Sequence, residues 1–429
     1  MKRAIVVGSG AGGATAAKEL QGKFSVTILE AGKEFRPFSL NLSLAEKLKK
    51  TGLLFDEKEI PLLFRAMKIR KTPDKMILVN GVSLGGTTTI STGSGLRMDK
   101  GLKKLGINLD PEFEEIYKEI PVSTEHQKRW RRMTKHLFEI CQQMGLDPHP
   151  TPKMGNIDRC TQCGRCILGC QQGAKWDSRI FLQHAIDKGA HLVTGCKVER
   201  VVIKDGRVLG AEAKKGWRRE FYPADLVILA AGGLSTPIIL ENSGVACEPR
   251  LFVDPVLCLA VEWKDCFLNS EIPMPFIVQR KNFILAPYFD YLSFYFNKNW
   301  HFPAKNILSV MIKLADTNAG RVLEKKIEKT LSGQDKENLK EGIEICRDIF
   351  DQLGVERDRT FLGTINAGHP GGMLPLTEQE ARNFHDPRLP ENLYLADATL
   401  FPNSLGNPPT LTIVAMAKRV SKLCIDRTK

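Results

Sequence analysis

The chain has 429 residues, of which 42% are hydrophobic and 7% aromatic, and its formal net charge is +13. These values fit a globular protein with two or three domains. No apolar run reaches the roughly 18 residues that a membrane-spanning helix needs, so we expect a cytoplasmic protein and leave peripheral contact with a membrane open. The positive charge suits an acidic partner or an anionic substrate, and without a binding motif we expect no nucleic-acid partner.

The first 30 residues carry a dinucleotide-binding pattern. A β-branched strand at residues 4–7 leads into a glycine-rich loop, and a helix at 14–20 and a strand at 25–29 follow it. The loop residues that we expect at a dinucleotide are Gly8, Gly10, Ala11 and Gly13. Glycines at this spacing permit a tight turn, the close approach of a pyrophosphate and close packing of helix on strand. Glu30, which ends the second strand, is placed to bind a ribose hydroxyl.

Two further segments lie before residue 100. Residues 41–71 are basic and amphipathic, which favours a pair of surface helices covering the core, with a lid or a membrane-facing element as the alternative. After them, two glycines followed by hydroxyl residues form a loop whose backbone can press against a phosphate or a flavin ring. The residues of this loop are Gly85, Gly86, Thr87 and Thr88.

A cysteine-rich run follows a helical, linker-like stretch at residues 111–150, and its members are Cys160, Cys163, Cys166 and Cys170. Their spacing is that of ferredoxin loops, in which short turns bring thiolates onto one iron–sulfur cluster. We therefore expect a [4Fe–4S] cluster, with a structural zinc site or unmetallated thiols as alternatives. The fourth ligand is either the last cysteine of the run or a distant one: Cys141, Cys196 or Cys258.

The second half of the chain continues the α/β pattern and then changes character. A helix at 180–190 leads into a strand at 191–202, and a buried strand at 225–231 is followed by a glycine loop and another helix. Residues 288–302 are crowded with aromatic side chains at strand-like alternation, which predicts sheet core and part of a substrate pocket. The sequence at 316–322 predicts a hairpin turn.

The C-terminal stretch combines a buried strand, a turn and a helix. The strand is expected at 392–398 and contains Asp397, and the helix is expected from Pro408 to Arg419, because proline suits a first turn and cations suit a last one. A helix N-terminus favours an anionic group. His369 and Asn407 flank that point on separate loops, as a base and its hydrogen-bonding companion would.

The combination of HPGG at 369–372, ADAT at 396–399 and GNPPT at 406–410 resembles the C-terminus of the glucose–methanol–choline (GMC) flavoproteins, most closely their cholesterol-oxidase-like branch. The resemblance implies FAD as cofactor, with His369 and Asn407 handling the substrate hydroxyl. It also implies that the isoalloxazine and adenine ends contact Asp397, Ala398, Pro408 and Val198. The glycine loops near residues 85 and 232 match the family's two signatures, although Ser91 stands where an asparagine is usual. Some members of this branch also carry a cysteine-rich loop.

The resemblance further implies an α/β fold in which a Rossmann-like FAD-binding domain is joined to an antiparallel-sheet substrate domain. We expect the FAD-binding domain to comprise residues 1–150, 181–250 and 363–429. The cysteine loop would occupy 151–180 and the substrate domain 251–362.

The function expected from this pattern is FAD-dependent oxidation of an alcohol to a carbonyl by hydride transfer. A cluster would pass the electrons to a protein or quinone acceptor. One alternative is a non-catalytic FAD and iron–sulfur electron-transfer subunit, which the His369–Asn407 pair makes less favoured because a relay needs no proton acceptor. The other is a carbonyl or enoyl reductase working in the reverse direction. The substrate and the oligomeric state do not follow from the sequence.

Overall fold

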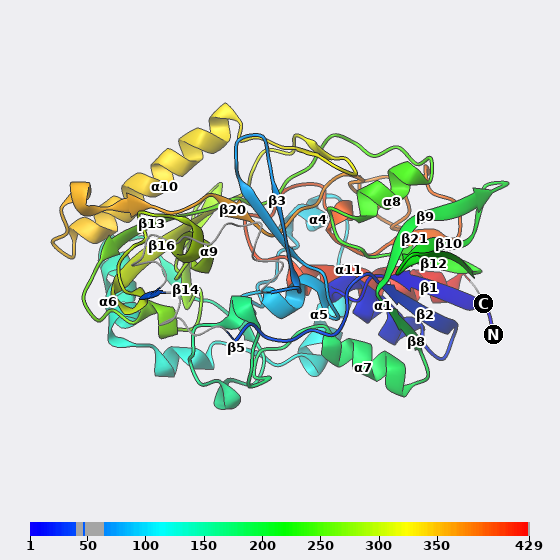
Figure 1. Cartoon of the computed structure of the whole chain (residues 1–429), viewed down its shortest axis with the longest axis horizontal. Coiled ribbons are helices and arrows are strands. Elements are labelled where there is room, and N and C mark those ends of the chain that lie inside the picture. Colours follow the sequence, from blue (N-terminus) through cyan, green and yellow to red (C-terminus); the bar gives the residue numbers. More distant parts are fainter. Residues whose placement is uncertain (40–45, 48–63, 428–429) are drawn as a thin grey trace.

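The computed structural model describes residues 1–39, 46–47 and 64–427, and it has two parts built around different sheets (Figure 1). The first is a five-stranded parallel sheet whose order β21-β12-β1-β2-β8 places β1 at its centre. Its strands are β1 (Arg3–Val7), β2 (Ser25–Glu30), β8 (His191–Thr194), β12 (Leu226–Leu229) and β21 (Leu393–Leu395). Both faces are covered, so these strands are nearly continuous apolar runs.

Helices share the hydrophobic core of this parallel sheet. They are α1 (Ala11–Leu20), α5 (Asp110–Glu119), α7 (Arg179–Asp187), α8 (Thr236–Asn242) and α11 (Thr410–Asp426), and the short α4 (Lys100–Lys104) precedes α5. Of these, α1 packs directly on the sheet. The predicted end of the last helix at Arg419 is wrong, because α11 continues for almost two more turns. Lys418 does not face solvent at a helix end; its ammonium is buried and pairs with Glu19, Glu115 and Glu119.

The second part is a nine-stranded, mostly antiparallel sheet with its own hydrophobic core. Its strands run in the order β3-β4-β20-β13-β16-β15-β14-β6, and β19 pairs with β13. They are β3 (Met67–Lys71), β4 (Ile77–Gly81), β6 (Pro148–Pro150), β13 (Val256–Glu262), β14 (Phe276–Gln279), β15 (Phe283–Pro287), β16 (Ile307–Leu314), β19 (Phe361–Leu362) and β20 (Asn366–Ala367). The helices α6 (Arg132–Gln143), α9 (Tyr291–Phe296) and α10 (Gly333–Asp351) lie at this end of the molecule (Figure 1).

Three small sheets or hairpins complete the described fold: β9 (Cys196–Lys204) with β10 (Arg207–Lys215) and β11 (Arg218–Pro223), β17 (Arg321–Val322) with β18 (Ile327–Glu328), and β5 (Val122–Ser123) with β7 (Lys153–Met154). The single strand predicted at 191–202 is in fact two, because the chain turns at Gly195, whose φ is +63°. As a result β8 belongs to the parallel sheet and β9 to the three-stranded one.

Two other local predictions were wrong. The aromatic segment contains the helix α9, which begins where the side chain of Asp290 accepts a hydrogen bond from the backbone N–H of Leu292. Residues 316–320 form a loop, and the hairpin turn lies later, between β17 and β18. The predicted surface helices at 41–71 fall largely outside the described residues.

The mixed α/β fold, with a parallel sheet and a mostly antiparallel second sheet, is confirmed. The β3–β4 hairpin, assigned to the first FAD-binding segment from the sequence, belongs to the nine-stranded sheet and runs across the middle of the molecule (Figure 1). In the part of the chain that is described, no helix is both long and apolar enough to cross a bilayer.

Candidate active site

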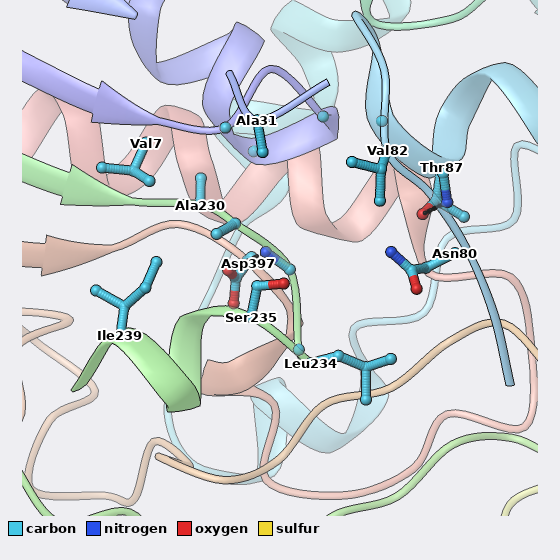
Figure 2. A pocket seen from close by; sticks show the side chains of 18 of the residues that line it. Val7, Ala31, Asn80, Val82, Thr87, Ala230, Leu234, Ser235, Ile239 and Asp397 are labelled. Atoms are coloured by element: carbon cyan, nitrogen blue, oxygen red, sulfur yellow. Dashed lines mark hydrogen bonds between the residues drawn. The ribbon is translucent and has the colours of Figure 1, made fainter. Parts of the chain in front are cut away.

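A cavity of about 760 Å³ opens at the carboxyl ends of β1, β2 and β12. Its volume lies toward the upper end of the range for small-molecule and cofactor pockets, and the edge of a parallel sheet where the strand order reverses is the usual place for a nucleotide. In Figure 2, Ala230, Ile239 and Asp397 line one side, and Asn80, Val82 and Thr87 stand on the other.

The glycine loop forms one wall of the cavity, and its glycines serve different purposes. A Cβ on Gly12 would lie 1.5 Å from the carbonyl oxygen of Ala396, and one on Gly13 would lie 2.0 Å from the carbonyl oxygen of Gly8, so both permit close packing of α1. A Cβ on Gly10 would meet no protein atom within 4 Å. Gly8, Gly10 and Ala11 line the cavity, whereas Gly13 does not.

The N-terminus of α1 presents unused donors to this cavity. Its N-cap is Gly10, which has no side chain to accept from the first backbone N–H groups. Such groups carry partial positive charge and favour an anion. The space beside Gly10 and these free donors therefore fit the pyrophosphate of a dinucleotide.

Glu30 lies at the same edge of the sheet and is nearly buried. One carboxylate oxygen accepts hydrogen bonds from the N–H and hydroxyl of Ser9, at 2.9 and 2.7 Å, and the other accepts from the N–H of Gly32 at 2.6 Å. Burial raises the pKa of this carboxyl, against those hydrogen bonds. Glu30 lines the cavity, as its predicted contact with a ribose requires.

The second glycine loop packs beside the first: the N–H of Gly85 donates to the hydroxyl of Ser9 at 3.1 Å, and a Cβ on Gly86 would lie 3.0 Å from the Cα of Gly10. Gly85 adopts a φ of +88° and Gly86 a φ of +52°, which glycine tolerates best. The hydroxyl of Thr88 donates to the carbonyl of Gly85 and contacts the hydroxyl of Ser178, which fixes the loop against α7. Gly86, Thr87 and Thr88 line the cavity, and Gly85 lies just behind them.

The C-terminal segment, residues 397–410, forms another part of the cavity wall. Asp397 accepts hydrogen bonds from the N–H of Gly232 and the hydroxyl of Thr236, so it joins the loop after β12 to that after β21. Asp397, Ala398 and, at the adenine end of the predicted site, Val198 all line the cavity. The predicted contact residue Pro408 does not; α11 begins two residues later, and Pro409 and Thr410 line the cavity instead.

His369 lies on the loop after β20 and lines the cavity. A quarter of its side chain is exposed, yet its Nδ1 atom is buried and has no hydrogen-bond partner among the described residues. The exposed part is therefore the other edge of the ring, which carries Nε2 and faces the cavity. Burial, together with the nearby charge of Lys313, holds the pKa of His369 below its ordinary value, so the imidazole is neutral and able to accept a proton.

Asn407 is buried and lies outside the residues that line the cavity. Its amide nitrogen donates to the side-chain oxygen of Gln279 at 3.0 Å, which ties it to the end of β14. Its side-chain oxygen is buried and lacks a hydrogen-bond partner in the described part of the chain. Asn407 thus has one acceptor atom unused, but the structure does not bring it to the cavity wall as it does His369.

The four cysteines of the central run, Cys160, Cys163, Cys166 and Cys170, all line a second, smaller cavity of about 40 Å³. Among the described residues, however, no group of three or more His, Cys, Asp or Glu side chains could hold a metal ion. The loop gathers the thiols around one space without forming a ready ligand set. The distant candidates Cys141, Cys196 and Cys258 are not in this lining.

Two buried lysines also line the cysteine cavity. The ammonium of Lys153 donates to the carbonyl of Pro273 and the hydroxyl of Ser94, and that of Lys175 donates to carbonyls of Thr88 and Cys166, among others. No described carboxylate forms an ion pair with either. Burial lowers the pKa of Lys153 to about 7. Buried cations normally have an anionic partner, and here the neighbouring groups are thiols.

Several cavity residues were missed in the sequence, among them Lys68, Arg70, Asn80 and Ile239. Lys68 and Arg70 alternate on β3 with apolar residues, and in sequence they resemble any solvated basic run. Only the pairing of β3 with β4 brings them to the cavity. The glycine loop at 232–235, which was placed at the nucleotide from the sequence, lines the cavity, and Figure 2 shows the side chains of Leu234 and Ser235 there.

Comparison with known proteins gives a consistent result. A family model described as GMC oxidoreductase matches residues 3–256. The uncharacterised protein MJ1450 of Methanocaldococcus jannaschii is 28% identical over 426 residues, which cover 96% of this chain and 97% of that protein. Long-chain-alcohol oxidase FAO4B of Arabidopsis thaliana is 26% identical over 271 residues, which cover 56% of this chain but 34% of the oxidase.

Solved structures share the fold at low sequence identity. Pyridoxine 4-oxidase from Mesorbium loti superposes with a TM-score of 0.73 at 14% identity, covering 98% of both chains. Formate oxidase from Aspergillus oryzae superposes with a TM-score of 0.70 at 15% identity, covering 99% of this chain and 98% of the oxidase. Neither the cholesterol-oxidase-like branch nor a ferredoxin-like loop is supported by these comparisons.

Proposed function

Because this chain belongs to the GMC oxidoreductase family of FAD enzymes, we propose that it oxidises an alcohol to the corresponding carbonyl compound. Long-chain-alcohol oxidases among its relatives support a CH–OH substrate. The observation that carries the proposal is His369, a neutral imidazole whose free edge faces the cavity. A base in that position can accept the hydroxyl proton of an alcohol.

The residues present fit FAD. The uncapped N-terminus of α1 and the open space beside Gly10 would hold its pyrophosphate, and Glu30 would accept from a ribose hydroxyl. The uncapped N-terminus of α11 would favour negative charge on the flavin. When bound, FAD would accept the hydride that leaves the alcohol carbon.

His369 would work together with the wall around it. Its Nε2 edge would take the hydroxyl proton, and Asn407, with one buried acceptor oxygen unused, would orient the same hydroxyl after a small movement of its loop. The backbone of the Gly86–Thr88 loop would exclude water from one face of the flavin ring. His369 would thus transfer a proton, and Asn407 and the loop would position the reactants, which these groups can do at pH 7.

The proposal also includes the group that accepts electrons from the flavin. Four cysteines around one space, beside two buried ammonium groups, support an anionic [4Fe–4S] cluster on Cys160, Cys163, Cys166 and Cys170. Such a cluster supplies one-electron transfer to a protein or quinone. The absence of a ready ligand set among the described residues means that the loop would have to tighten around the iron.

The test is anaerobic mixing of the purified flavoprotein with a panel of primary and secondary alcohols of increasing chain length. We expect loss of oxidised-flavin absorbance with at least one alcohol and formation of one carbonyl per flavin reduced. Retention of FAD without reduction by any alcohol, but with oxidation of reduced flavin by a carbonyl or an enone, would instead establish the reductase direction.

A further inference from the structure

Behind His369 lies a buried carboxylate that sequence reasoning did not single out. Asp254 precedes β13 and is 1% exposed, and its Oδ2 atom lies 3.6 Å from Nδ1 of His369. The same oxygen is paired with the ammonium of Lys313 on β16 at 2.5 Å. Three ionisable side chains from three segments thus meet on the closed side of the imidazole, away from the cavity.

The other oxygen of Asp254 reaches the loop that carries Asn407. It accepts from the hydroxyl of Ser404 and, at 3.4 Å, from the N–H of Gly406. One carboxylate therefore contacts both loops of the predicted catalytic pair, and Lys313 attaches it to the second sheet. This arrangement fixes His369 and the Asn407 loop relative to each other.

The backbone of Asp254 is held in an unusual conformation. Its φ is +53°, in the left-handed region that residues with a side chain rarely adopt. The carboxylate of Asp316 accepts from the N–H groups of both Val253 and Asp254, and Asp316 is itself paired with buried Lys329 at 2.7 Å. A second buried ion pair thus holds the turn that aims Asp254 at the histidine, and such strain clusters at functional sites.

We propose that Asp254 is a positioning residue for His369: it accepts a hydrogen bond from Nδ1–H, so that the proton of the neutral ring stays on Nδ1 and Nε2 is left unprotonated and directed into the cavity as the base. The inference rests on the proposed function of His369. Movement of about 0.7 Å would bring the two atoms within ordinary hydrogen-bond distance. Lys313 keeps Asp254 ionised and in place: burial acts to raise the pKa of this carboxyl, but Lys313 and His369 bring it below its usual value.

The two single substitutions are poor tests by themselves. Removing either partner of a buried ion pair leaves an uncompensated charge, which destabilises the fold whatever the function. In Asp254→Asn alone, the amide oxygen would turn toward Lys313 and still accept from Nδ1. The double variant Asp254→Asn/Lys313→Met avoids both problems, because the amide oxygen then faces the donor at Gly406 and the amide N–H₂ faces Nδ1.

The experiment compares the tautomer of His369 with the rate of flavin reduction. Holoenzyme labelled with ¹⁵N-histidine is examined at pH 8 by long-range ¹⁵N–¹H NMR, and His369→Gln identifies the signal among the eight histidines. We expect the Nδ1–H form in the wild type and the Nε2–H form in the double variant. Flavin reduction in the double variant should fall by about 10²–10⁴-fold with little change in KM.

Glu112→Gln is the matched control, because Glu112 is another buried, cation-paired carboxylate, held by Arg419, and neither residue lines the cavity. It should change neither the tautomer nor the rate. An Nε2–H or doubly protonated ring in the wild type would overturn the inference, as would a double variant that keeps the wild-type tautomer. If no alcohol reduces the wild-type flavin but the tautomer switches as expected, the proposed function fails and the role of Asp254 stands.

Discussion

At the scale of single residues, His369 carries most of the proposed chemistry. Its replacement by alanine removes the proton acceptor but leaves the glycine loops and Glu30 in place. We expect His369→Ala to retain FAD and to reduce it with alcohol about 10²–10⁴-fold more slowly, the usual loss for an acid–base group. Stopped-flow absorbance under anaerobic conditions measures this rate. His149→Ala, at an exposed histidine on the outer strand β6, is the control and should react normally; equal rates in both variants would make His369 structural.

The pH dependence of the same step follows from the environment of His369. Burial and the charge of Lys313 lower its pKa, and the charge of Asp254 only partly opposes them. A base works in its unprotonated form, so the rate should be flat at neutral and alkaline pH. It should fall about tenfold per pH unit once the pH drops below the histidine's pKa, which lies under the ordinary value of about 6.5. A midpoint above 7 in single-turnover measurements would contradict the observed burial.

The sequence pattern singled out His369, Glu30 and Asp397 through their motifs and the family resemblance, and all three line one cavity. It missed Asp254 and Lys313. Asp254 precedes a proline and Lys313 lies in an apolar strand, and neither context marks a functional residue in the sequence. The pairing of β13 with β16 brings the two side chains together. Pairing across about 60 residues is invisible to local pattern.

At the scale of elements, two glycine-to-alanine substitutions in the first glycine loop should have different effects, one on folding and one on FAD binding. Gly12→Ala would place a Cβ against the backbone of Ala396, where no side chain can move away. We expect it to lower the free energy of unfolding by about 3 kcal/mol or more, as severe overpacking does. Denaturant unfolding of the FAD-free protein measures this loss.

Gly10→Ala should behave in the opposite way, because its Cβ would meet no protein atom and would enter the space assigned to the pyrophosphate. The FAD-free variant should unfold within about 1 kcal/mol of the wild type, while its affinity for FAD falls by at least about tenfold. Titration with FAD followed by flavin fluorescence measures the affinity. Normal FAD binding by Gly10→Ala would show that the cofactor does not approach this loop.

Most elements of the parallel sheet could be predicted because their apolar runs and bounding glycines are local signals. The secondary-structure predictions were wrong where tertiary contacts override these local signals. Lys418 looked like the last turn of a helix, yet three glutamates from α1 and α5 solvate it inside the structure, and α11 continues. The aromatic segment near residue 291 alternates like a strand, but the cap at Asp290 starts a helix.

At the scale of the whole molecule, one buried cation links the cysteine cavity to the main cavity. The ammonium of Lys175 donates to the carbonyls of Thr88, Thr89 and Ser91 on the flavin-side loop, and at 3.1 Å to the carbonyl of Cys166. The two cavities therefore share a wall. A redox group in the smaller one would lie next to the loop that is expected to contact the flavin, which is the arrangement that electron transfer between them needs.

The content of that smaller cavity is the last prediction. We expect protein purified without oxygen to hold about four irons and four sulfides per chain, the stoichiometry of one cube. Cys163→Ser should lose the iron and keep FAD, because the glycine loops do not depend on this exposed cysteine. Alcohol should still reduce the flavin in this variant, while reduction of an added one-electron acceptor should fail. Metal and sulfide analysis with parallel flavin assays measures all of these quantities.

Cys247→Ser is the control for that experiment, since Cys247 is a half-buried cysteine outside the cavity and should leave the iron content unchanged. Zinc in place of iron would make the loop a structural site. Neither metal nor sulfide would leave Lys153 and Lys175 buried beside uncharged thiols, and would favour an enzyme that passes its electrons directly to oxygen. The two buried lysines make the first result the expected one, because thiolates bound to iron would supply an anionic partner, and no described carboxylate forms an ion pair with either lysine.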